Sequence, residues 1–453
     1  MTSGQAPLLS TGAVFPLGPD FAGRRYAVLG LARSGLATVT ALIAAGARVT
    51  AWDDRPEACD AAVALGADIA DLLSIDLSGI AGVVVSPGVP INRHPIAEAA
   101  RAAHVPIIGD IELFAQARAH LPPHKVVGIT GTNGKSTTTA LIHHILKNAG
   151  VPTTMGGNIG LPILAQAALP AGGVTVLELS SYQIDLTHSL DLDVAVLLNI
   201  TPDHLDRYDG DFMAYAASKE RLFTMQSKGQ VAVIATDDEP SAMIASRINH
   251  RLHRVSARDI DSSAQTRWPA LQGPHNAQNA AAAAVVCRAL GLDDEAIERG
   301  LATYPGLPHR MERVAEVGGV LFINDSKATN AASAAPALAA YPPVVGRARI
   351  HWILGGLAKG EGLGECEAWL GHVAHAYLIG DAAAMFARAL GSRVPSSYSG
   401  TVEQAVADAA HAAQSGDAVL LSPACASFDQ FRDFEARGDA FRAAVVPLSG
   451  GGQ

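Results

Sequence analysis

The chain contains the stretch Val126-Val-Gly-Ile-Thr-Gly-Thr-Asn-Gly-Lys-Ser136, and a helical pattern follows it to Asn148. The apolar start is typical of a buried strand, and the rest is a glycine loop that ends in Lys-Ser. A strand, a glycine loop and a helix N-terminus together form a cradle of backbone N–H groups for phosphate, to which the lysine adds a charge. The loop is shorter than the standard pattern, whose first glycine would stand where Ile129 is. We therefore predict a phosphate-binding loop made of Gly131, Thr132, Asn133, Gly134, Lys135, Ser136 and Thr137.

Polar side chains follow two further apolar runs downstream of this loop. Val174–Glu178 ends in an acid, and Val194–Asn199 leads into Thr201-Pro-Asp-His204. Mg²⁺ prefers oxygen ligands and is commonly shared with nucleotide phosphates, so Ser136 and Glu178 are the expected ligands. A helix is predicted over 211–224 with Asp211 as its N-cap. It carries Lys219, which on pattern alone is either an exposed helix lysine or part of the site.

The first part of the chain predicts a β-α-β unit. Strand patterns at 26–30 and 48–52 flank a helical pattern, and Asp53 and Asp54 follow the second strand. The unit resembles a dinucleotide-binding start, but Ala32 stands where the middle glycine would let the backbone approach a pyrophosphate. This alanine disfavours an NAD-dependent oxidoreductase. A later strand, 82–86, runs into Pro87-Gly88 at the sheet edge where such folds bind ligands.

The last part again alternates strands and helices. Apolar runs at 320–324, 351–356, 376–380 and 417–422 follow a Pro/Gly-rich stretch at 305–310 that suits a linker. We therefore predict an α/β protein of three domains: a Rossmann-like N-terminal domain (1–113), a central P-loop domain with a parallel sheet (114–306) and a C-terminal Rossmann-like α/β domain (307–453).

Composition limits the functional class. Of the 453 residues, 49% are hydrophobic and 17% charged, which predicts packed cores rather than disorder. The net charge of −10 disfavours a broad nucleic-acid footprint. The four cysteines are far apart and form no C-x-x-C pair, so neither disulfides nor a cysteine zinc site is expected. No apolar run reaches the roughly 18 residues of a membrane span, and the start lacks signal-peptide features. We expect a cytoplasmic protein without membrane insertion or nucleic-acid partner.

The motifs, taken in order along the chain, resemble the ATP-dependent Mur ligases, bacterial enzymes that add amino acids to the peptidoglycan precursor. They are G-T-N-G-K-S at 131–136, G-G-N-I-G at 156–160, E-L-S-S at 178–181, T-P-D-H-L-D-R at 201–207, H-N-x-x-N at 275–279 and H-R at 309–310. The segments S-P-G at 86–88, G-L-P-H-R-M-E at 306–312, N-D-S-K-A-T-N at 324–330 and S-P-A-C-A-S-F-D-Q-F at 422–431 are most similar to the members that add D-glutamate.

The resemblance implies an amide ligase that activates the carboxylate of UDP-N-acetylmuramoyl-L-alanine (UDP-MurNAc-L-Ala) as an acyl phosphate. It implies ATP and two Mg²⁺ ions, with catalytic roles for Lys135, His204 and Lys219. One ion is assigned to Ser136 and Glu178, and the other to His204 and a carbamylated Lys219. Further ATP residues are Asn276, Asn279, Arg310, Asp325 and Lys327. D-glutamate is assigned to Thr329, Lys359, Ser427 and Phe434. The UDP end is assigned to Arg33, Ser34, Asp53, Asp54, Ser86 and Asn158. We expect a monomer.

Three alternatives stay open at this point. The first is a sister ligase with another amino-acid specificity or a folylpolyglutamate synthase, although the latter should lack the first Rossmann-like block. The member that adds meso-diaminopimelate should carry a D-N-P-R tetrapeptide, which this sequence does not contain. The second is a nucleotide-gated binding switch without ligase chemistry, and the third is the oxidoreductase that Ala32 disfavours.

Overall fold

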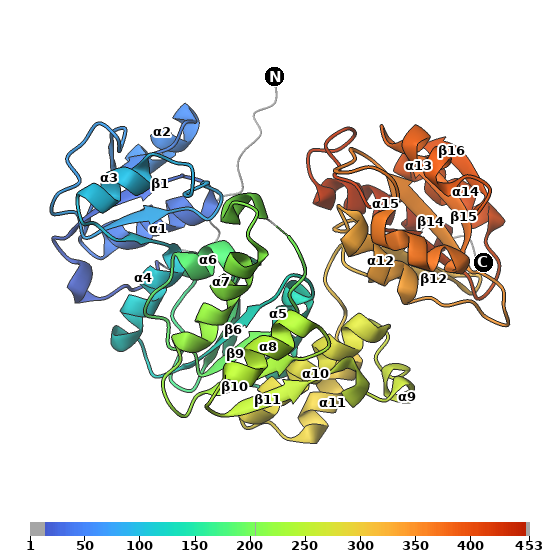
Figure 1. Cartoon of the computed structure of the whole chain (residues 1–453), viewed down its shortest axis with the longest axis horizontal. Helices are drawn as coiled ribbons and strands as arrows, with labels where there is room; N and C mark the ends of the chain where they lie inside the picture. Colours follow the sequence, from blue (N-terminus) through green and yellow to red (C-terminus); the bar gives the residue numbers. More distant parts are fainter. Residues whose placement is uncertain (1–13, 204, 450–453) are drawn as a thin grey trace. The chain divides into compact units, whose positions relative to one another are not determined.

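The computed structural model describes residues 14–203 and 205–449. The chain divides into two compact units, and each contains parallel β-sheet covered by helices (Figure 1). The first unit comprises residues up to Ser256 together with Ala281–Gly300, and the second comprises Ala257–Ala280 and the residues from Leu301 onward. The α/β fold class predicted from the sequence is confirmed.

The N-terminal sheet of the first unit has five parallel strands in the order β3-β2-β1-β4-β5. The strands are β1 (Arg25–Leu29), β2 (Arg48–Trp52), β3 (Asp68–Ile69), β4 (Gly82–Val85) and β5 (Ile107–Ile108). The helices of this part are α1 (Arg33–Ala44), α2 (Pro56–Ala64), α3 (Ile96–Ala102) and α4 (Asp110–Ala117). The carboxyl ends of the central strands β1 and β4 lead into the loops that begin at Gly30 and Ser86, where ligands bind in folds of this class.

The second sheet of the first unit has six parallel strands in the order β11-β10-β9-β6-β8-β7. The strands are β6 (Lys125–Thr130), β7 (Thr153–Gly157), β8 (Val174–Glu178), β9 (Val194–Leu197), β10 (Val231–Ala235) and β11 (Leu252–Val255). The helices that follow them are α5 (Lys135–Asn148), α6 (Ser181–Asp185), α7 (Phe212–Thr224) and α8 (Glu239–Arg247). Strand β6 lies between β9 and β8, so the glycine loop leaves the middle of the sheet.

The sheet of the second unit has six strands in the order β12-β13-β17-β14-β15-β16. The strands are β12 (Glu312–Val317), β13 (Val320–Asn324), β14 (Ile350–Gly355), β15 (Val373–Ile379), β16 (Ser396–Gly400) and β17 (Ala418–Leu421). Only the β12–β13 pair is antiparallel among these described strands. The helices from residue 257 onward are α9 (Ser262–Gln265), α10 (Pro274–Ala289), α11 (Asp294–Thr303), α12 (Ala331–Ala339), α13 (Ala383–Leu390), α14 (Val402–Ala412) and α15 (Phe434–Ser449).

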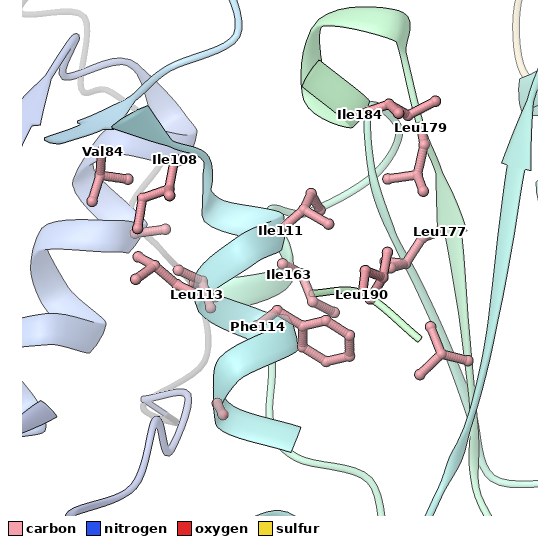
Figure 2. Close-up of a cluster of buried hydrophobic side chains, with 14 of the residues drawn as sticks. Val84, Ile108, Ile111, Leu113, Phe114, Ile163, Leu177, Leu179, Ile184 and Leu190 are labelled. Atoms are coloured by element: carbon pink, nitrogen blue, oxygen red, sulfur yellow. The ribbon is translucent and has the colours of Figure 1, made fainter. Parts of the chain in front are cut away.

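A continuous hydrophobic core joins the two sheets of the first unit through α4. Ile111 and Phe114 of this helix lie between Ile108 of the first sheet and Leu177 and Leu190 of the second part (Figure 2). All five side chains are buried, and burial of each contributes about 1.5–3 kcal/mol. The predicted boundary at 113–114 falls inside α4, and the boundary at 306–307 falls between α11 and β12. The three-domain division stays a prediction.

Local chemistry explains how the elements begin and end. Strands β4, β8, β9 and β10 are rich in Val and Ala and are buried along their whole length, as expected of strands covered on both faces. Asp211 accepts hydrogen bonds from the N–H groups of Met213 and Ala214, which confirms it as the N-cap of α7. The strand predicted over 194–199 ends at Leu197, because Asn199 turns toward the glycine loop. In the described part of the chain, no helix has both the length and the hydrophobicity needed to cross a bilayer.

Candidate active site

The glycine loop has the backbone conformation that its sequence predicts. Gly131 and Gly134 have positive φ angles of 150° and 84°, and Gly134 is the N-cap of α5. A Cβ atom on Gly131 would lie 3.1 Å from Leu198 Cβ, so the loop passes close to the end of β9. The first turn of α5 directs its backbone N–H groups toward the loop, as in anion-binding helix N-termini.

Asn199 holds this loop in place, a role that the sequence analysis missed. Its carbonyl oxygen accepts from the Thr132 N–H (2.9 Å), and its Oδ1 accepts from the Asn133 N–H (2.8 Å). Its Nδ2 donates to the Asn133 carbonyl at 3.1 Å. Of the predicted phosphate-binding N–H groups, those of Thr132 and Asn133 are therefore engaged within the protein. The only signal in the sequence is the position of Asn199 at the end of an apolar strand.

Two lysines meet at the carbonyl oxygen of Gly131. The Lys135 ammonium donates to the Gly131 and Thr132 carbonyls at 2.9 and 2.7 Å. Lys219 Nζ donates to the same Gly131 oxygen at 2.9 Å. The sequence placed both residues in the site, and the structure brings them to one atom.

Lys219 is not the exposed helix lysine that its sequence pattern allowed. Its side chain is 2% exposed and its Nζ lies 4.6 Å from the centroid of the Tyr215 ring. Burial first, and the charge of Lys135 second, hold the pKa of Lys219 well below its usual value. Tyr215 also contacts the loop, because its hydroxyl lies 3.0 Å from Thr132 Oγ1. The four-residue spacing of Tyr215 and Lys219 on a helix is the signal that could have identified the tyrosine.

Glu178 ends strand β8 with a buried and half-satisfied carboxylate. Its Oε1 accepts from Asn158 Nδ2 at 2.9 Å, whereas no hydrogen-bond partner for its Oε2 is found among the described residues. The backbone supports this contact, because the Asn158 N–H donates to the Glu178 carbonyl at 2.9 Å. A Cβ atom on Gly157 would lie 2.1 Å from that carbonyl, which explains the glycine. An unpaired buried carboxylate oxygen is costly unless a cation or donor binds it.

The candidate metal ligands are individual side chains rather than a cluster. No group of three or more His, Cys, Asp or Glu residues suited to a metal ion is found within 14–203 and 205–449. Ser136 and Glu178 are both buried and both offer oxygen atoms. His204, the remaining predicted ligand, lies outside the described residues.

Two of the residues assigned to the UDP end are hydrogen-bonded to the Gly30–Gly35 loop. Ser86 Oγ donates to the Gly30 carbonyl at 2.8 Å, and Asp53 Oδ2 accepts from the Leu31 N–H at 2.6 Å. Asp53 also pairs with Arg55 at 2.9 Å, and this hydrogen-bonded pairing lowers the pKa of Asp53 to about 2. Both polar groups therefore help to hold the loop, and their assignment to the UDP end stays a prediction.

The other residues assigned to the UDP end lie around this loop. Arg33 and Asp54 are exposed and Ser34 is half-buried. Arg33 donates to the Gly160 carbonyl at 3.3 Å, and the G-G-N-I-G segment that contains Gly160 also contains the exposed Asn158. A Cβ atom on Gly35 would lie 1.9 Å from the Gly30 carbonyl oxygen, so the start of α1 packs against the loop without room for a side chain.

In the second unit, Asp325 follows β13 and is buried. Both of its carboxylate oxygens accept hydrogen bonds, from the Met311 N–H (3.1 Å) and from Ser422 Oγ (2.7 Å). Burial outweighs these bonds and raises the pKa of Asp325 to about 7. The predicted contact with ribose hydroxyls therefore competes with partners that the protein already supplies.

The remaining ATP candidates of the second unit fall into three groups. Lys327 Nζ lies 3.9 Å from the centroid of the Phe434 ring, which brings an ATP candidate and a D-glutamate candidate together. Arg310 is half-buried beside His309, whose φ is 61°. Asn276 and Asn279 are buried at the start of α10, where Asn279 Nδ2 donates to Asn276 Oδ1 at 3.2 Å.

A buried arginine that the sequence analysis missed binds main-chain segments next to some of the ATP and D-glutamate candidates. Arg437 donates to the Ser326, Cys425 and Ala426 carbonyls at 2.8, 3.0 and 3.2 Å, and to Ser326 Oγ at 3.0 Å. It thereby joins the segment before Lys327 to the segment before Ser427, which is buried. The exposed Lys359 donates to Thr329 Oγ1 at 3.3 Å. The structure thus brings Thr329 and Lys359 together on one side of the unit.

Comparisons with known proteins agree with these features. Residues 129–269 match the Mur ligase middle domain, and residues 309–425 match the Mur ligase glutamate ligase domain. The UDP-N-acetylmuramoylalanine–D-glutamate ligase of Sphingopyxis alaskensis is 72% identical over 94% of this chain and 98% of the relative. That of Zymomonas mobilis is 56% identical over 95% of this chain and 99% of the relative.

A solved structure shows the same fold at low identity. The UDP-N-acetylmuramate–alanine ligase of Thermotoga maritima has a TM-score of 0.56 and 16% identity, and the alignment covers 94% of this chain and 99% of that one. Identity of 72% across nearly the whole length of a curated relative, together with the two domain matches, shows that the chain belongs to the Mur ligase family.

Proposed function

We propose that this chain joins the carboxyl group of UDP-MurNAc-L-Ala to the amine of D-glutamate with conversion of ATP to ADP and phosphate, a step in the synthesis of the peptidoglycan precursor. The strongest support is the identity to UDP-N-acetylmuramoylalanine–D-glutamate ligases along almost the whole chain. The meeting of Lys135 and Lys219 at the glycine loop is the geometric feature that suits this chemistry.

The first step is phosphoryl transfer between two anions. An oxygen of the substrate carboxylate attacks the γ-phosphorus of ATP, the bond to the β–γ bridging oxygen breaks, and ADP leaves. Repulsion between carboxylate and triphosphate is the main barrier, so the protein must place positive charge and N–H donors around the transferred group. Lys135 and the first turn of α5 supply both. Arg310 and Lys327 are assigned to the ATP phosphates, and Asn276, Asn279 and Asp325 to the rest of the nucleotide.

The second step is acyl transfer to the amine. The neutral amine of D-glutamate attacks the acyl carbon, phosphate leaves with the former carboxylate oxygen, and the nitrogen loses a proton. Lys359, Thr329 and Ser427 suit a dicarboxylate, because an ammonium group and hydroxyls can bind carboxylates while none of the three offers an acid to a cationic side chain. Phe434 contributes an apolar wall beside Lys327.

Mg²⁺ fits the residues at the glycine loop. The unpaired Glu178 Oε2 and the buried Ser136 hydroxyl would hold one ion, and His204 with a carbamylated Lys219 would hold the second. Bound Mg²⁺ would supply positive charge to the phosphoryl oxygens. The depressed pKa of Lys219 supports the modification, since only a neutral amine adds CO₂ to form a carbamate and release a proton. The carbamate would then offer anionic oxygens in place of a repelling ammonium.

An amino-acid screen tests the proposed function. Phosphate release is measured with UDP-MurNAc-L-Ala, ATP and Mg²⁺ in the presence of D-glutamate, L-glutamate, L-alanine, L-lysine or meso-diaminopimelate. We expect turnover with D-glutamate and little with the others. Preference for another amino acid would indicate a sister ligase, and phosphate release that needs no amino acid would indicate a nucleotide switch. We further propose that the enzyme is a monomer and acts in the cytoplasm, the compartment that holds ATP.

A further inference from the structure

Arg207 connects the two parts of the first unit by a bidentate contact. It belongs to the 3₁₀ turn Leu205–Tyr208, in the segment that follows β9. Its NH1 donates to the Val89 carbonyl and its NH2 to the Pro87 carbonyl, both at 2.6 Å. These carbonyls belong to the turn Ser86–Val89, hereafter the 86–89 turn, which is closed by a hydrogen bond from the Val89 N–H to the Ser86 carbonyl.

The contact continues at Asp206, the residue before Arg207. Asn92 Nδ2 and an Arg93 guanidinium nitrogen both donate to the Asp206 carbonyl at 3.2 Å, so two neighbouring residues of each segment take part. The 86–89 turn is in turn bonded to the Gly30–Gly35 loop, because Ser86 Oγ donates to the Gly30 carbonyl. Arg207 therefore binds the loop after β4 directly and is linked through Ser86 to the loop after β1.

On its other side, Arg207 is packed against residues that lead to Lys219. Its guanidinium carbon lies 4.0 Å from the centroid of the Tyr182 ring in α6, a helix that lies beside α7 (Figure 1). The Tyr182 ring stacks on Tyr208 at 6.4 Å between centroids, and Tyr208 meets the Tyr215 ring edge-on at 5.6 Å.

Hydrogen bonds fix these rings. The Tyr208 hydroxyl donates to Asp185 Oδ2 at 2.8 Å and lies 3.2 Å from Ser218 Oγ, the neighbour of Lys219. Tyr215 faces Lys219 and is hydrogen-bonded to Thr132 of the glycine loop. Stacked rings with hydrogen-bonded hydroxyls have few alternative arrangements. A change in the position of Arg207 would therefore also shift the rings that contact the glycine loop.

We propose that Arg207 is a positioning residue that fixes the 86–89 turn, and with it the UDP end of the precursor, relative to Lys135 and Lys219. This inference rests on the proposed function, since it assumes that the precursor binds at the loops after β1 and β4. An arginine suits the task because its planar guanidinium donates to two carbonyls at once while one face lies on an aromatic ring. A lysine can place one donor at a time and cannot stack in the same way.

The test compares Arg207→Lys and Arg207→Met with the matched variants Arg221→Lys and Arg221→Met. Arg221 also donates to a main-chain carbonyl, that of Thr187 at 2.9 Å, but among the described residues it has no hydrogen bond to the 86–89 turn. We expect the KM for UDP-MurNAc-L-Ala to rise about tenfold in Arg207→Lys, and kcat/KM for this substrate to fall about a hundredfold in Arg207→Met. The KM values for ATP and D-glutamate should stay within about twofold of wild type.

Calorimetric binding of UDP-MurNAc-L-Ala to the full chain, without ATP or D-glutamate, gives a readout that needs no turnover. Affinity should fall in the order wild type, Arg207→Lys, Arg207→Met, with the Arg221 variants equal to wild type. Equal losses for all three substrates, or equal effects of the Arg221 variants, would mean that Arg207 is merely structural and would overturn the proposal. Absence of D-glutamate-dependent turnover in wild type would instead defeat the proposed function, while the binding series would still decide the role of Arg207.

Discussion

Lys219 is buried and donates a hydrogen bond to the glycine loop. An ordinary lysine on a helix surface is exposed to solvent and makes no such contact. We expect Lys219→Ala to lose at least about a hundredfold in kcat, because the proposed carbamate oxygens disappear with the side chain. A small carboxylate such as acetate should restore part of the activity by occupying the vacated volume. The measurement is steady-state phosphate release at saturating Mg²⁺ and ATP, with and without acetate.

Lys147→Ala is the matched control for this variant. Lys147 is exposed in the last turn of α5, the helix that begins at the glycine loop, so its loss should change stability by no more than about 0.5 kcal/mol and leave kcat unchanged. If Lys219→Ala also retained wild-type kcat, Lys219 would have no part in the chemistry.

Asp325 should make the stability of the protein depend on pH. Its pKa is raised to about 7 in the folded protein from an ordinary value of 3.8, so the folded state binds more protons than the unfolded state between these values. The contribution of Asp325 to the free energy of unfolding is therefore most favourable below about pH 4, and this contribution is lost as the pH rises through about 7. Asp325→Asn removes this ionisation. The Tm of Asp325→Asn minus that of wild type should therefore increase between pH 5 and pH 8. The corresponding difference in the free energy of unfolding is on the order of a few kcal/mol.

Thermal unfolding of both proteins across this pH range is the measurement. Only the difference between variant and wild type matters, since other groups titrate equally in both. A difference in Tm that stays constant from pH 5 to pH 8 would show that Asp325 is already ionised in the folded protein, paired with a positive charge.

At the scale of single elements, helix α1 begins against the Gly30–Gly35 loop with no space for a methyl group on Gly35. Gly35→Ala would place a Cβ atom 1.9 Å from the Gly30 carbonyl oxygen, a backbone atom that cannot rotate away. We expect a loss of about 1–3 kcal/mol in the free energy of unfolding and weaker binding of UDP-MurNAc-L-Ala, with the KM for ATP unchanged. Denaturant unfolding and calorimetry measure the two effects.

Gly371→Ala is the control, because a Cβ atom there would meet no heavy atom within 4 Å and its φ is not in the left-handed region. Its stability should stay within about 0.5 kcal/mol of wild type. Wild-type stability and affinity in Gly35→Ala would show that the loop can shift, and that its position does not decide how the precursor binds.

The elements themselves follow closely from sequence pattern. Buried Val-rich runs and helix caps are local signals, and they located most of the central strands and the start of α7. They did not predict the edge strands of the three sheets, which are β3, β5, β7, β11, β12 and β16. Other departures occur where a side chain reaches a distant segment. The strand at 194 ends early because Asn199 bonds to a loop 66 residues away. Asp53 and Ser86 were assigned to the substrate from their position at a strand end, and the sequence does not show that they also bond to the Gly30–Gly35 loop.

At the scale of the whole molecule, alternating strand and helix patterns predicted the α/β fold, and the order of the motifs along the chain predicted the ligase family. Arg437 has no local signature, because a single arginine in a helix is usually a surface charge. Arg207 lies in a recognised motif, but the motif does not show which carbonyls this arginine binds. Their role becomes visible only when the carbonyls that they bind are seen to come from segments far apart in the chain.

The reaction sequence itself makes a prediction that depends on every part of the site. When UDP-MurNAc-L-Ala carries ¹⁸O in the carboxyl group of its alanine, acyl-phosphate formation transfers one of these oxygens to the phosphate that leaves. The measurement is the mass of the phosphate released in the presence of ATP, Mg²⁺ and D-glutamate, together with the mass of the amide product. We predict one ¹⁸O atom in each phosphate and one in the new amide. Unlabelled phosphate released in step with amide formation would contradict activation of the carboxylate by ATP.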